Sequence, residues 1–266
     1  RGRQLIVQGG RVIGLRAERD GKDFFVKANR GVLLASGGFE WNPEMARRFM
    51  NVTNLRGMSP NSLEGDGHIM GMEAGAAIAL MDHAIYQPVF HSQGEIIQGK
   101  PFYRPLSYGY PGNIIVNRHG KRCCNESFYP DIGRAFVEYD KNRSELANAP
   151  LYWVADHTET ERSYMALLAT TTKDTSWLVK ADTLRDLAEK LGIPGDTLVE
   201  TVERFNRFAK EGRDPDFHRG ESTYNQYWGS RRNPDFSPGP VLGPLETPPF
   251  YGIKLELGSV GTLGGL

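Results

Sequence analysis

Two adjacent glycines, Gly37 and Gly38, directly follow an uncharged and largely apolar run at residues 31–36. Such a run is typical of a strand that is buried on both faces of a parallel sheet. Ligands of these sheets bind beyond the carboxyl ends of the strands, and residues without side chains let the backbone approach a large ligand closely. The segment therefore predicts a nucleotide site at the two glycines. An ordinary strand and turn is the alternative interpretation.

Asp66 lies between two glycines at residues 65–67. Its carboxylate could accept hydrogen bonds from the hydroxyl groups of a ribose or ribityl chain. It could equally cap the helix that the next residues predict. Gly67, Gly71 and Gly75 are four residues apart, so they share one face of that helix and would allow close contact with another element or a ligand.

The sequence does not predict a metal site. The histidines at positions 68, 83 and 91 lack the spacing of ligands, and the only two cysteines, Cys123 and Cys124, are adjacent. Adjacent cysteines give neither a zinc site nor a disulfide framework. We therefore expect no metal, and a reducing compartment such as the cytoplasm.

Composition excludes several classes of protein. The chain has 266 residues, 39% of them hydrophobic, and no apolar run approaches the roughly 18 residues of a membrane-spanning helix. The 32 basic and 32 acidic residues cancel, without a long block of like charge. We expect small-molecule partners, no nucleic acid and no integral membrane segment.

Hydrophobic periodicity predicts the elements that position these residues. Alternating segments before residue 34, with turns at Gly9–Gly10 and Asp20–Gly21, predict consecutive β-hairpins. Further strands are predicted at residues 113–117, 151–155 and 250–255. Helices are predicted after Asn42, with Pro43 in the first turn, and after the capping residues Asp182 and Asp196. Irregular, proline-containing spacing at residues 85–109 predicts a crossing into a second domain.

The two ends of the chain are unusual. It begins with Arg1 rather than methionine, it ends at Leu266 within a glycine-rich stretch, and it contains no G-x-G-x-x-G. We therefore expect an internal fragment whose dinucleotide fingerprint lies before residue 1.

Seven motifs, in this order, resemble the flavoproteins grouped with fumarate reductase and 3-ketosteroid dehydrogenase. They are Gly-Gly-Arg-Val near residue 10, residues 34–39, residues 65–67, residues 111–126, residues 180–184, Asn206 with residues 214–217, and residues 261–266. The resemblance implies an α/β plus α+β fold in which a Rossmann-like FAD-binding domain is interrupted by a substrate-capping domain. On this basis residues 1–85 and 246–266 belong to the FAD-binding domain and residues 86–245 to the capping domain.

The resemblance also implies the cofactor and its binding residues. The cofactor is FAD, and the residues that we assign to it are Ala35, Ser36, Gly37, Gly38, Asp66, Gly261, Thr262 and Gly264. Four further residues are assigned to an apolar substrate pocket: Tyr103, Tyr108, Tyr110 and Val260.

The family's substrate classes differ at two places. Members that reduce fumarate resemble one another in a histidine before Thr-x-Gly-Gly and an arginine shortly after Asn-Glu, because a dicarboxylate needs cationic partners. This chain has Val260 at the first place and Tyr129 near the second. In this it is similar to the ketosteroid dehydrogenases. The similarity implies an FAD-dependent dehydrogenase that introduces a carbon–carbon double bond next to a ketone, with a 3-ketosteroid as first candidate substrate and a separate electron acceptor.

Tyr129 is the catalytic residue that this resemblance implies. A phenol can donate a proton to a developing oxyanion, or act as a base if its pKa is lowered. A partly buried packing aromatic is the alternative. Arg122 is expected to pair with Glu126 rather than to bind substrate. Because the family's other catalytic groups lie outside these residues, we expect no activity from this fragment alone.

Two other functions remain open. One is a fumarate- or enoate-type flavin reductase, which would run the chemistry in the opposite direction. The other is a flavin-domain fragment that serves only as a folded module.

Overall fold

The computed structural model describes residues 1–97, 99–106, 108–162, 175–232 and 241–266. The chain forms two compact units: residues 1–85 with 259–266, and residues 86–258. It leaves the first unit within β5 (Ala84–Ile97) and returns within β12 (Phe250–Thr262). We predicted the return at residue 246. Residues 246–258 belong to the second unit because β12 pairs there with β10 (Leu151–Ala155).

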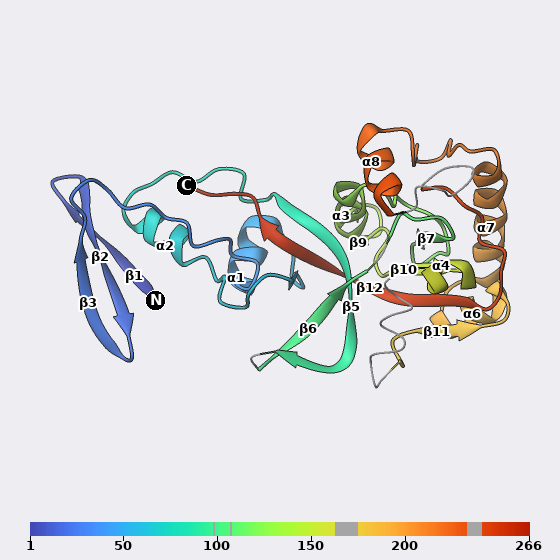
Figure 1. The fold of residues 1–266 in the computed structure, drawn as a ribbon, viewed down its shortest axis with the longest axis horizontal. Coiled ribbons are helices and arrows are strands. Elements are labelled where there is room, and N and C mark those ends of the chain that lie inside the picture. The colour runs from blue at the N-terminus through green and yellow to red at the C-terminus, as the bar shows by residue number, and fades with distance from the viewer. Residues whose placement is uncertain (98, 107, 163–174, 233–240) are drawn as a thin grey trace. The chain divides into compact units, whose positions relative to one another are not determined.

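The first unit begins with a three-stranded antiparallel sheet, coloured blue in Figure 1. Its strands are β1 (Gly2–Gln8), β2 (Arg11–Arg19) and β3 (Lys22–Lys27). Gly9, Gly10, Asp20 and Gly21 have positive φ angles, which the two tight turns between these strands require. The consecutive hairpins predicted from the sequence are confirmed.

The strand that we predicted at residues 31–36 is absent. The segment is irregular, and Leu33 is 89% exposed. A strand persists only where a neighbouring strand satisfies its backbone groups, and in the described part of the chain no strand pairs with this run. Its apolar composition was therefore insufficient to identify a strand.

Three short elements and one longer helix follow. They are α1 (Pro43–Met45), the π-helical turn η1 (Ala46–Met50), β4 (Arg56–Gly57) and α2 (Asp66–Glu73). The Asn42 side chain caps α1 by accepting a 3.0 Å hydrogen bond from Met45 N, and Pro43 lies in the first turn, as predicted. Gly65, with a φ angle of 84°, caps α2 without a side-chain bond, so Asp66 is not the cap. Gly75 lies beyond the end of α2, which leaves only Gly67 and Gly71 on its face.

The second unit is built around an antiparallel sheet with the strand order β6-β5-β12-β10-β7, to which β11 adds on β12. The other strands of this sheet are β6 (Lys100–Pro105), β7 (Asn113–Val116) and β11 (Val179–Ala181). Strands β8 (Tyr139–Asp140) and β9 (Glu145–Leu146) form a separate two-stranded sheet. Its helices are α3 (Tyr129–Val137), α4 (His157–Arg162), α6 (Leu184–Leu191), α7 (Gly195–Lys210) and α8 (Thr223–Arg232). The strands that we predicted at residues 113–117, 151–155 and 250–255 are confirmed.

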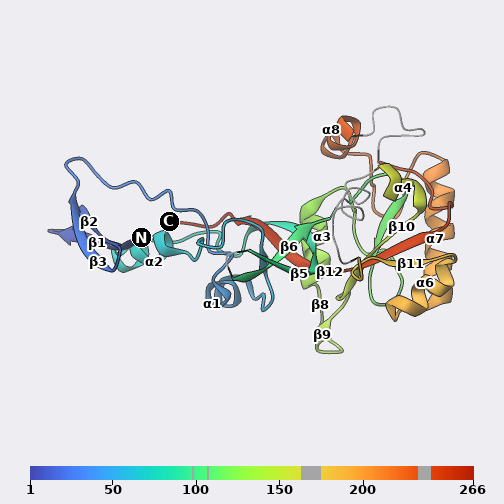
Figure 2. The ribbon, with the colours of Figure 1, turned by 60° about the horizontal axis from the view of Figure 1, so that its bottom comes forward.

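The core of this unit lies between the sheet and the pair α6 and α7, which lie side by side in both views (Figure 1 and Figure 2). Tyr152 and Val154 of β10 pack against Leu187 of α6 and Phe205 of α7. Because these residues alternate along the strand and recur at helical spacing, burial of their apolar surface supplies the main stabilisation.

Both helices begin differently from our prediction. Thr183, rather than Asp182, caps α6, and its hydroxyl accepts a 3.1 Å bond from Asp186 N. Helix α7 begins at Gly195, after Pro194, and the Asp196 carboxylate instead pairs with Arg185. Asp182 and Asp196 have the right residue type for a cap, but the cap is the residue at which the backbone enters the helix.

Candidate functional site

The glycine loop of the first unit, residues 36–40, lies against the end of β12. Phe39 N donates a 3.1 Å hydrogen bond to the Thr262 hydroxyl. A Cβ atom on Gly38 would lie 2.2 Å from Thr262 Oγ1 and 2.4 Å from Glu40 Oε2. Only glycine fits between these oxygens, so close packing requires Gly38 here.

The same loop contacts the start of α2. Gly65 N donates to the Gly38 carbonyl at 3.1 Å. A Cβ on Gly67 would lie 2.3 Å from Ser36 Oγ, so the helix packs directly on the loop. The Asp66 carboxylate accepts two 2.6 Å bonds from Arg1, one on each oxygen. Each oxygen keeps a lone pair, so Asp66 can still accept a ligand hydroxyl.

The glycine-rich segment after Ser259 is fixed from several directions. His68 Nε2 donates to the Gly264 carbonyl at 2.9 Å, across 196 positions of sequence. Leu263 N donates to the His83 carbonyl at 2.9 Å, and Gly265 exchanges two backbone bonds with Ala79. The loop, α2 and the glycine-rich segment therefore form one packed arrangement within the first unit.

A cavity of about 470 Å³ opens beside this arrangement, and its size is typical of small-molecule sites. Three of the residues that we assigned to FAD line it: Ala35, Ser36 and Asp66. Gly37, Gly38, Thr262 and Gly264 lie in the packed arrangement and not in the lining of this cavity. Gly261 does not line the cavity either, but the space beside its Cα is open.

The residues present fit a flavin nucleotide. The cavity wall combines small and apolar side chains with two carboxylates, those of Glu64 and Asp66. A Cβ on Gly261, outside this wall, would meet nothing within 4 Å. Backbone without side chains and an acceptor for sugar hydroxyls are what a dinucleotide needs from its protein. Ala35, Ser36, Asp66 and Gly261 could therefore hold parts of FAD.

Sequence reasoning missed two residues of this arrangement. Glu40 is 2% exposed; its Oε1 accepts from the Ser59 hydroxyl, while its Oε2 has no hydrogen-bond partner among the described residues. His68 was considered only as a metal ligand, although its bond to Gly264 connects two distant segments. No spacing rule identifies such a contact, because its partners are far apart in the sequence.

Tyr129 is the first residue of α3 in the second unit, and Pro130 follows in the first turn, where proline is favoured. Its ring is partly buried. The ring centroid lies 6.1 Å from that of Phe128 and 6.3 Å from that of Tyr224 on α8. Tyr224 is 37% exposed, and burial raises the pKa of its phenol, with a further increase from Tyr129.

A buried ionic network lies beside this aromatic cluster. Arg122 donates to Glu126 at two 2.7 Å distances and to Asp214 at 2.9 and 2.8 Å. Arg219, which is fully buried, donates to Glu126 at 3.4 Å and to the carbonyls of Asn113 and Tyr110. The predicted pairing of Arg122 with Glu126 is confirmed.

The charges of this network balance. Burial acts to raise the pKa of Asp214, but hydrogen bonds and charge from Arg122 outweigh burial, so the pKa lies below its ordinary value. The Arg122 guanidinium also lies 4.8 Å from the ring centre of Phe205. Both arginines of this region are therefore used inside the protein, and neither is available as a clamp for an anionic substrate.

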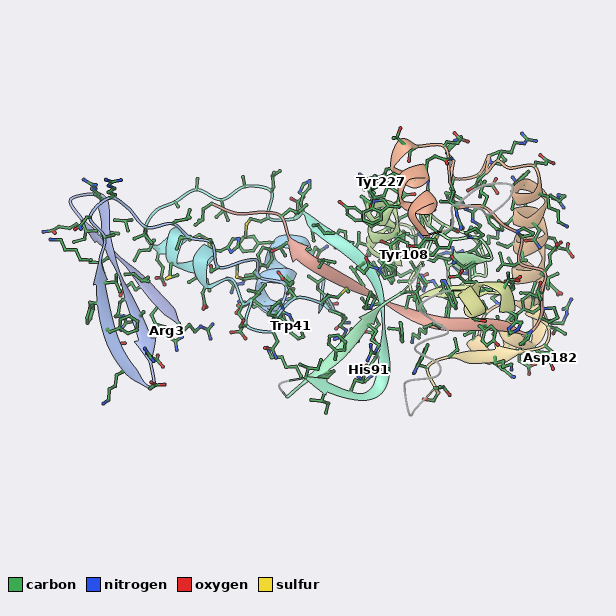
Figure 3. The ribbon with its side chains drawn as sticks, in the orientation of Figure 1. Arg3, Trp41, His91, Tyr108, Asp182 and Tyr227 are labelled. Carbon is green, nitrogen blue, oxygen red and sulfur yellow. The ribbon has the colours of Figure 1, made fainter. Side chains whose placement is uncertain are left out.

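The four residues that we assigned to a substrate pocket have separate surroundings. Tyr108, labelled in Figure 3, donates to Gln87 Oε1 at 3.2 Å, and the Tyr110 carbonyl accepts from Arg219. The Tyr103 ring, on β6, lies 5.2 Å from His91. Val260 belongs to the first unit and is 47% exposed. The described contacts do not join these four residues in one pocket.

Two features are absent from the described residues. In the part of the chain that the structure describes, no three His, Cys, Asp or Glu side chains form a group that could hold a metal ion. Over the same ranges, no helix combines the length and the hydropathy needed to cross a bilayer.

Comparison with known proteins identifies the family. The model of the FAD binding domain matches residues 1–266, so the chain belongs to this FAD-binding family, as the sequence motifs suggest. It is 37% identical to 4-oxocyclohexanecarboxylate 2-dehydrogenase of Sinomonas cyclohexanicum, over 100% of this chain and 47% of that protein. It is 36% identical to 3-oxosteroid 1-dehydrogenase of Mycolicibacterium smegmatis, over 98% of this chain and 48% of that protein.

A solved structure of a ketosteroid dehydrogenase also resembles this chain. The 3-ketosteroid Δ1-dehydrogenase of Sterolibacterium denitrificans, in complex with 1,4-androstadiene-3,17-dione, matches with a TM-score of 0.85 and 30% identity. The match covers 100% of this chain and 48% of that chain. The chain thus spans about half the length of the relatives that it matches. The predicted fold class and cofactor are confirmed.

Proposed function

We propose that this chain contributes the cofactor cradle and one catalytic residue of an FAD-dependent dehydrogenase. The enzyme would introduce a carbon–carbon double bond next to a ketone, with a 3-ketosteroid as substrate. Within it, residues 1–85 and 259–266 would form the FAD-binding part, and residues 86–258 the capping part.

One observation carries this proposal. Beyond the Asn125–Glu126 motif the chain presents a phenol, Tyr129, while Arg122 and Arg219 are both neutralised in the buried network. A neutral hydroxyl suits an apolar substrate with a single ketone, because a permanent charge facing apolar surface would be costly to desolvate. A dicarboxylate would need cationic partners that these two arginines do not offer.

The residues divide the chemistry as follows. Ala35, Ser36, Asp66 and Gly261 would bind and orient FAD, which when bound supplies the acceptor for hydride. As a phenolate, Tyr129 would take the proton from the carbon next to the carbonyl. As a neutral phenol it would instead donate to the carbonyl oxygen and stabilise the negative charge that develops there, and the proton would then go to another base of the full-length enzyme. Two hydrogens thus leave adjacent carbons, one as a proton and one as hydride.

The names of these relatives support a ketone substrate, but the two substrates differ in size and charge. One acts on an oxosteroid and another on 4-oxocyclohexanecarboxylate, which carries a carboxylate as well as a ketone. Because Arg122 and Arg219 are already paired, we propose the uncharged steroid rather than the carboxylate-bearing ring. The reduced flavin would need a separate electron acceptor, and the free thiols of Cys123 and Cys124 fit a reducing, cytoplasmic compartment.

The test uses the purified protein in its full native length. We expect a 3-ketosteroid to bleach the flavin absorption and an artificial electron acceptor to restore it. Tyr129→Phe should slow bleaching by roughly 10²–10⁴-fold, the usual contribution of a general acid or base. Tyr139→Phe, an exposed tyrosine on β8, is the matched control and should leave the rate unchanged.

Other outcomes support other functions. Reoxidation of the reduced flavin by fumarate would support a reductase. A colourless preparation that takes up no FAD would support a module without activity. Bleaching by 4-oxocyclohexanecarboxylate but not by any steroid would contradict the proposed substrate and retain the chemistry.

A further inference from the structure

The two cysteines of this chain are adjacent, and they form a short segment between two fixed parts of the second unit. Cys123 is partly exposed, whereas Cys124 is 1% exposed. The two thiols share a hydrogen bond, so their sulfur atoms are neighbours. In such a pair the accessible thiol can react with a solute, and the buried thiol can react only with its neighbour.

The backbone before the pair is fixed to the central sheet. Arg122 forms an isolated β-bridge with Val116 of β7. Its side chain is 4% exposed and makes four hydrogen bonds to the carboxylates of Glu126 and Asp214. Because a buried guanidinium loses several kcal/mol when it leaves its carboxylates, the residue before Cys123 is strongly held.

The backbone after the pair is attached to α3 and α8 by fewer bonds. Asn125 N donates to the Asp131 carboxylate, in the first turn of α3, at 2.8 Å. Asn125 Nδ2 donates to Oδ1 of the buried Asn225 at 3.2 Å. Helix α3 begins at Tyr129, so a displacement of the residue after Cys124 is transmitted to the segment that carries Tyr129.

A disulfide between adjacent residues would change the backbone between them. Consecutive Cα atoms lie about 3.8 Å apart across a trans peptide. The Cα atoms of ordinary disulfides lie about 4.4–6.8 Å apart, so a bridge between neighbours needs a distorted backbone. Arg122 is held by four charged bonds and Asn125 by two bonds, so the distortion should fall mainly on the Asn125 side.

We propose that Cys123 and Cys124 form an oxidant-sensitive modification site, at which hydrogen peroxide converts the two thiols to a vicinal disulfide. The bridge displaces Asn125 and thereby Tyr129. In the first step the Cys123 sulfur attacks the O–O bond, which gives a sulfenic acid and one water. In the second step the Cys124 sulfur attacks the oxidised sulfur, the S–S bond forms and a second water leaves. Two electrons pass from the thiols to the peroxide, and the two thiol hydrogens end in the water.

The chemical modification and its effect on the reaction are separate parts of this inference. The effect on the reaction rests on the proposed function, in which Tyr129 is the reacting phenol, but the disulfide does not. Because a bridge of distorted geometry is readily reduced, the modification is reversible by cellular thiols. It is therefore compatible with a reducing compartment, where disulfides are typically transient.

Peptide mapping of the full-length, flavin-loaded protein tests the modification. Trypsin cleaves after Arg122 and Arg134, so one peptide, residues 123–134, carries both cysteines. After treatment with hydrogen peroxide under native conditions, the remaining thiols are blocked in denaturant. We expect this peptide to lack two hydrogen atoms and to carry no blocking group, and dithiothreitol should restore both thiols. In Cys124→Ala, the matched control, Cys123 should be oxidised without forming a bridge.

Hydrogen exchange measures whether the bridge affects α3. In the peroxide-treated protein, amide exchange at residues 125–137 should become about tenfold faster, because weakened bonds of Asn125 make this segment open more often. Dithiothreitol should reverse the change. Helix α6, in the same unit, is the internal control and should exchange at an unchanged rate.

Flavin reduction by a ketosteroid supplies the functional measurement. Peroxide treatment should slow bleaching by about tenfold or more, because misplacing a reacting group by about 1 Å can cost 10²-fold in rate. Dithiothreitol should restore the rate. Cys123→Ser should bleach as fast as the unchanged protein, both before and after peroxide treatment, because it cannot form the bridge.

Three results would overturn the inference. The first is a treated peptide without the internal bridge, whether its thiols are intact or Cys123 is oxidised further. The second is a bridge that leaves hydrogen exchange at residues 125–137 unchanged, and the third is an equal loss of bleaching rate in Cys123→Ser. Mapping and exchange need no substrate, so they remain decisive even if no ketone reduces the flavin. If Cys124→Ala does not fold, Cys123→Ser replaces it as the control for mapping.

Discussion

Arg122 and Asp214 form a doubly hydrogen-bonded ion pair, at 2.9 and 2.8 Å, between residues 92 positions apart. The same guanidinium holds Glu126, so a single side chain connects the loop before Tyr129 to the segment before α8. The side chains of Arg122 and Asp214 are 4% and 0% exposed. This network is both a structural element of the second unit and the reason that its arginines cannot serve as substrate clamps.

Removing one carboxylate should strongly destabilise the second unit. Asp214→Asn leaves Arg122 with an incompletely compensated buried charge, which typically costs about 3–5 kcal/mol. The free energy of unfolding from urea titration measures the effect. Asp216→Asn is the matched control, because its pair with Arg204 lies at the surface and should contribute under about 1 kcal/mol. Equal losses in the two variants would contradict this account.

The contribution of Asp214 to the free energy of unfolding should decrease as the pH is lowered. Its pKa in the folded protein lies below the ordinary value, so its stabilisation is fully present above the unfolded pKa of about 3.9. It is lost as the pH falls through the folded pKa. The difference in unfolding free energy between the unchanged and Asp214→Asn proteins should therefore be constant at pH 6–8 and shrink below about pH 4. A difference that grows on acidification would show that another group dominates.

Two glycines of the first unit should respond differently to alanine. A Cβ on Gly38 would overlap Thr262 and Glu40, so Gly38→Ala should lower the melting temperature and the flavin content together. Gly261 has open space around its Cβ position, so Gly261→Ala should leave the melting temperature of the apoprotein unchanged. If FAD binds there, the FAD dissociation constant of Gly261→Ala should rise at least tenfold. Unchanged flavin affinity would remove Gly261 from the cofactor site.

The adjacent cysteines should differ in reactivity. A hydrogen bond with Cys123 and complete burial raise the pKa of the Cys124 thiol, whereas Cys123 is partly exposed. Iodoacetamide at pH 8 should therefore label Cys123 first, and Cys124 only after denaturation. Peptide mapping by mass spectrometry distinguishes the two sites. Labelling of Cys124 at the same rate in the native protein would show that this segment opens readily.

Local patterns predicted many of the elements correctly. The β1–β3 hairpins, α6, α7 and strands β7 and β10 follow from alternation, helical period and turn residues, all of which act within a few positions. The Arg122–Glu126 pair was also predictable, because four residues separate its partners. The run at residues 31–36 was misread because its conformation depends on a neighbouring strand and not on its own composition.

The sequence by itself determined the family and the cofactor, because motif order and glycine positions survive as linear patterns. Only the tertiary structure decided that His68 holds Gly264, that Asp214 completes the Arg122 pair and that Tyr224 lies beside Tyr129. These contacts join residues that are 92 to 196 positions apart in the sequence. Such contacts form only when the whole chain buries its apolar surface, so no local pattern encodes them.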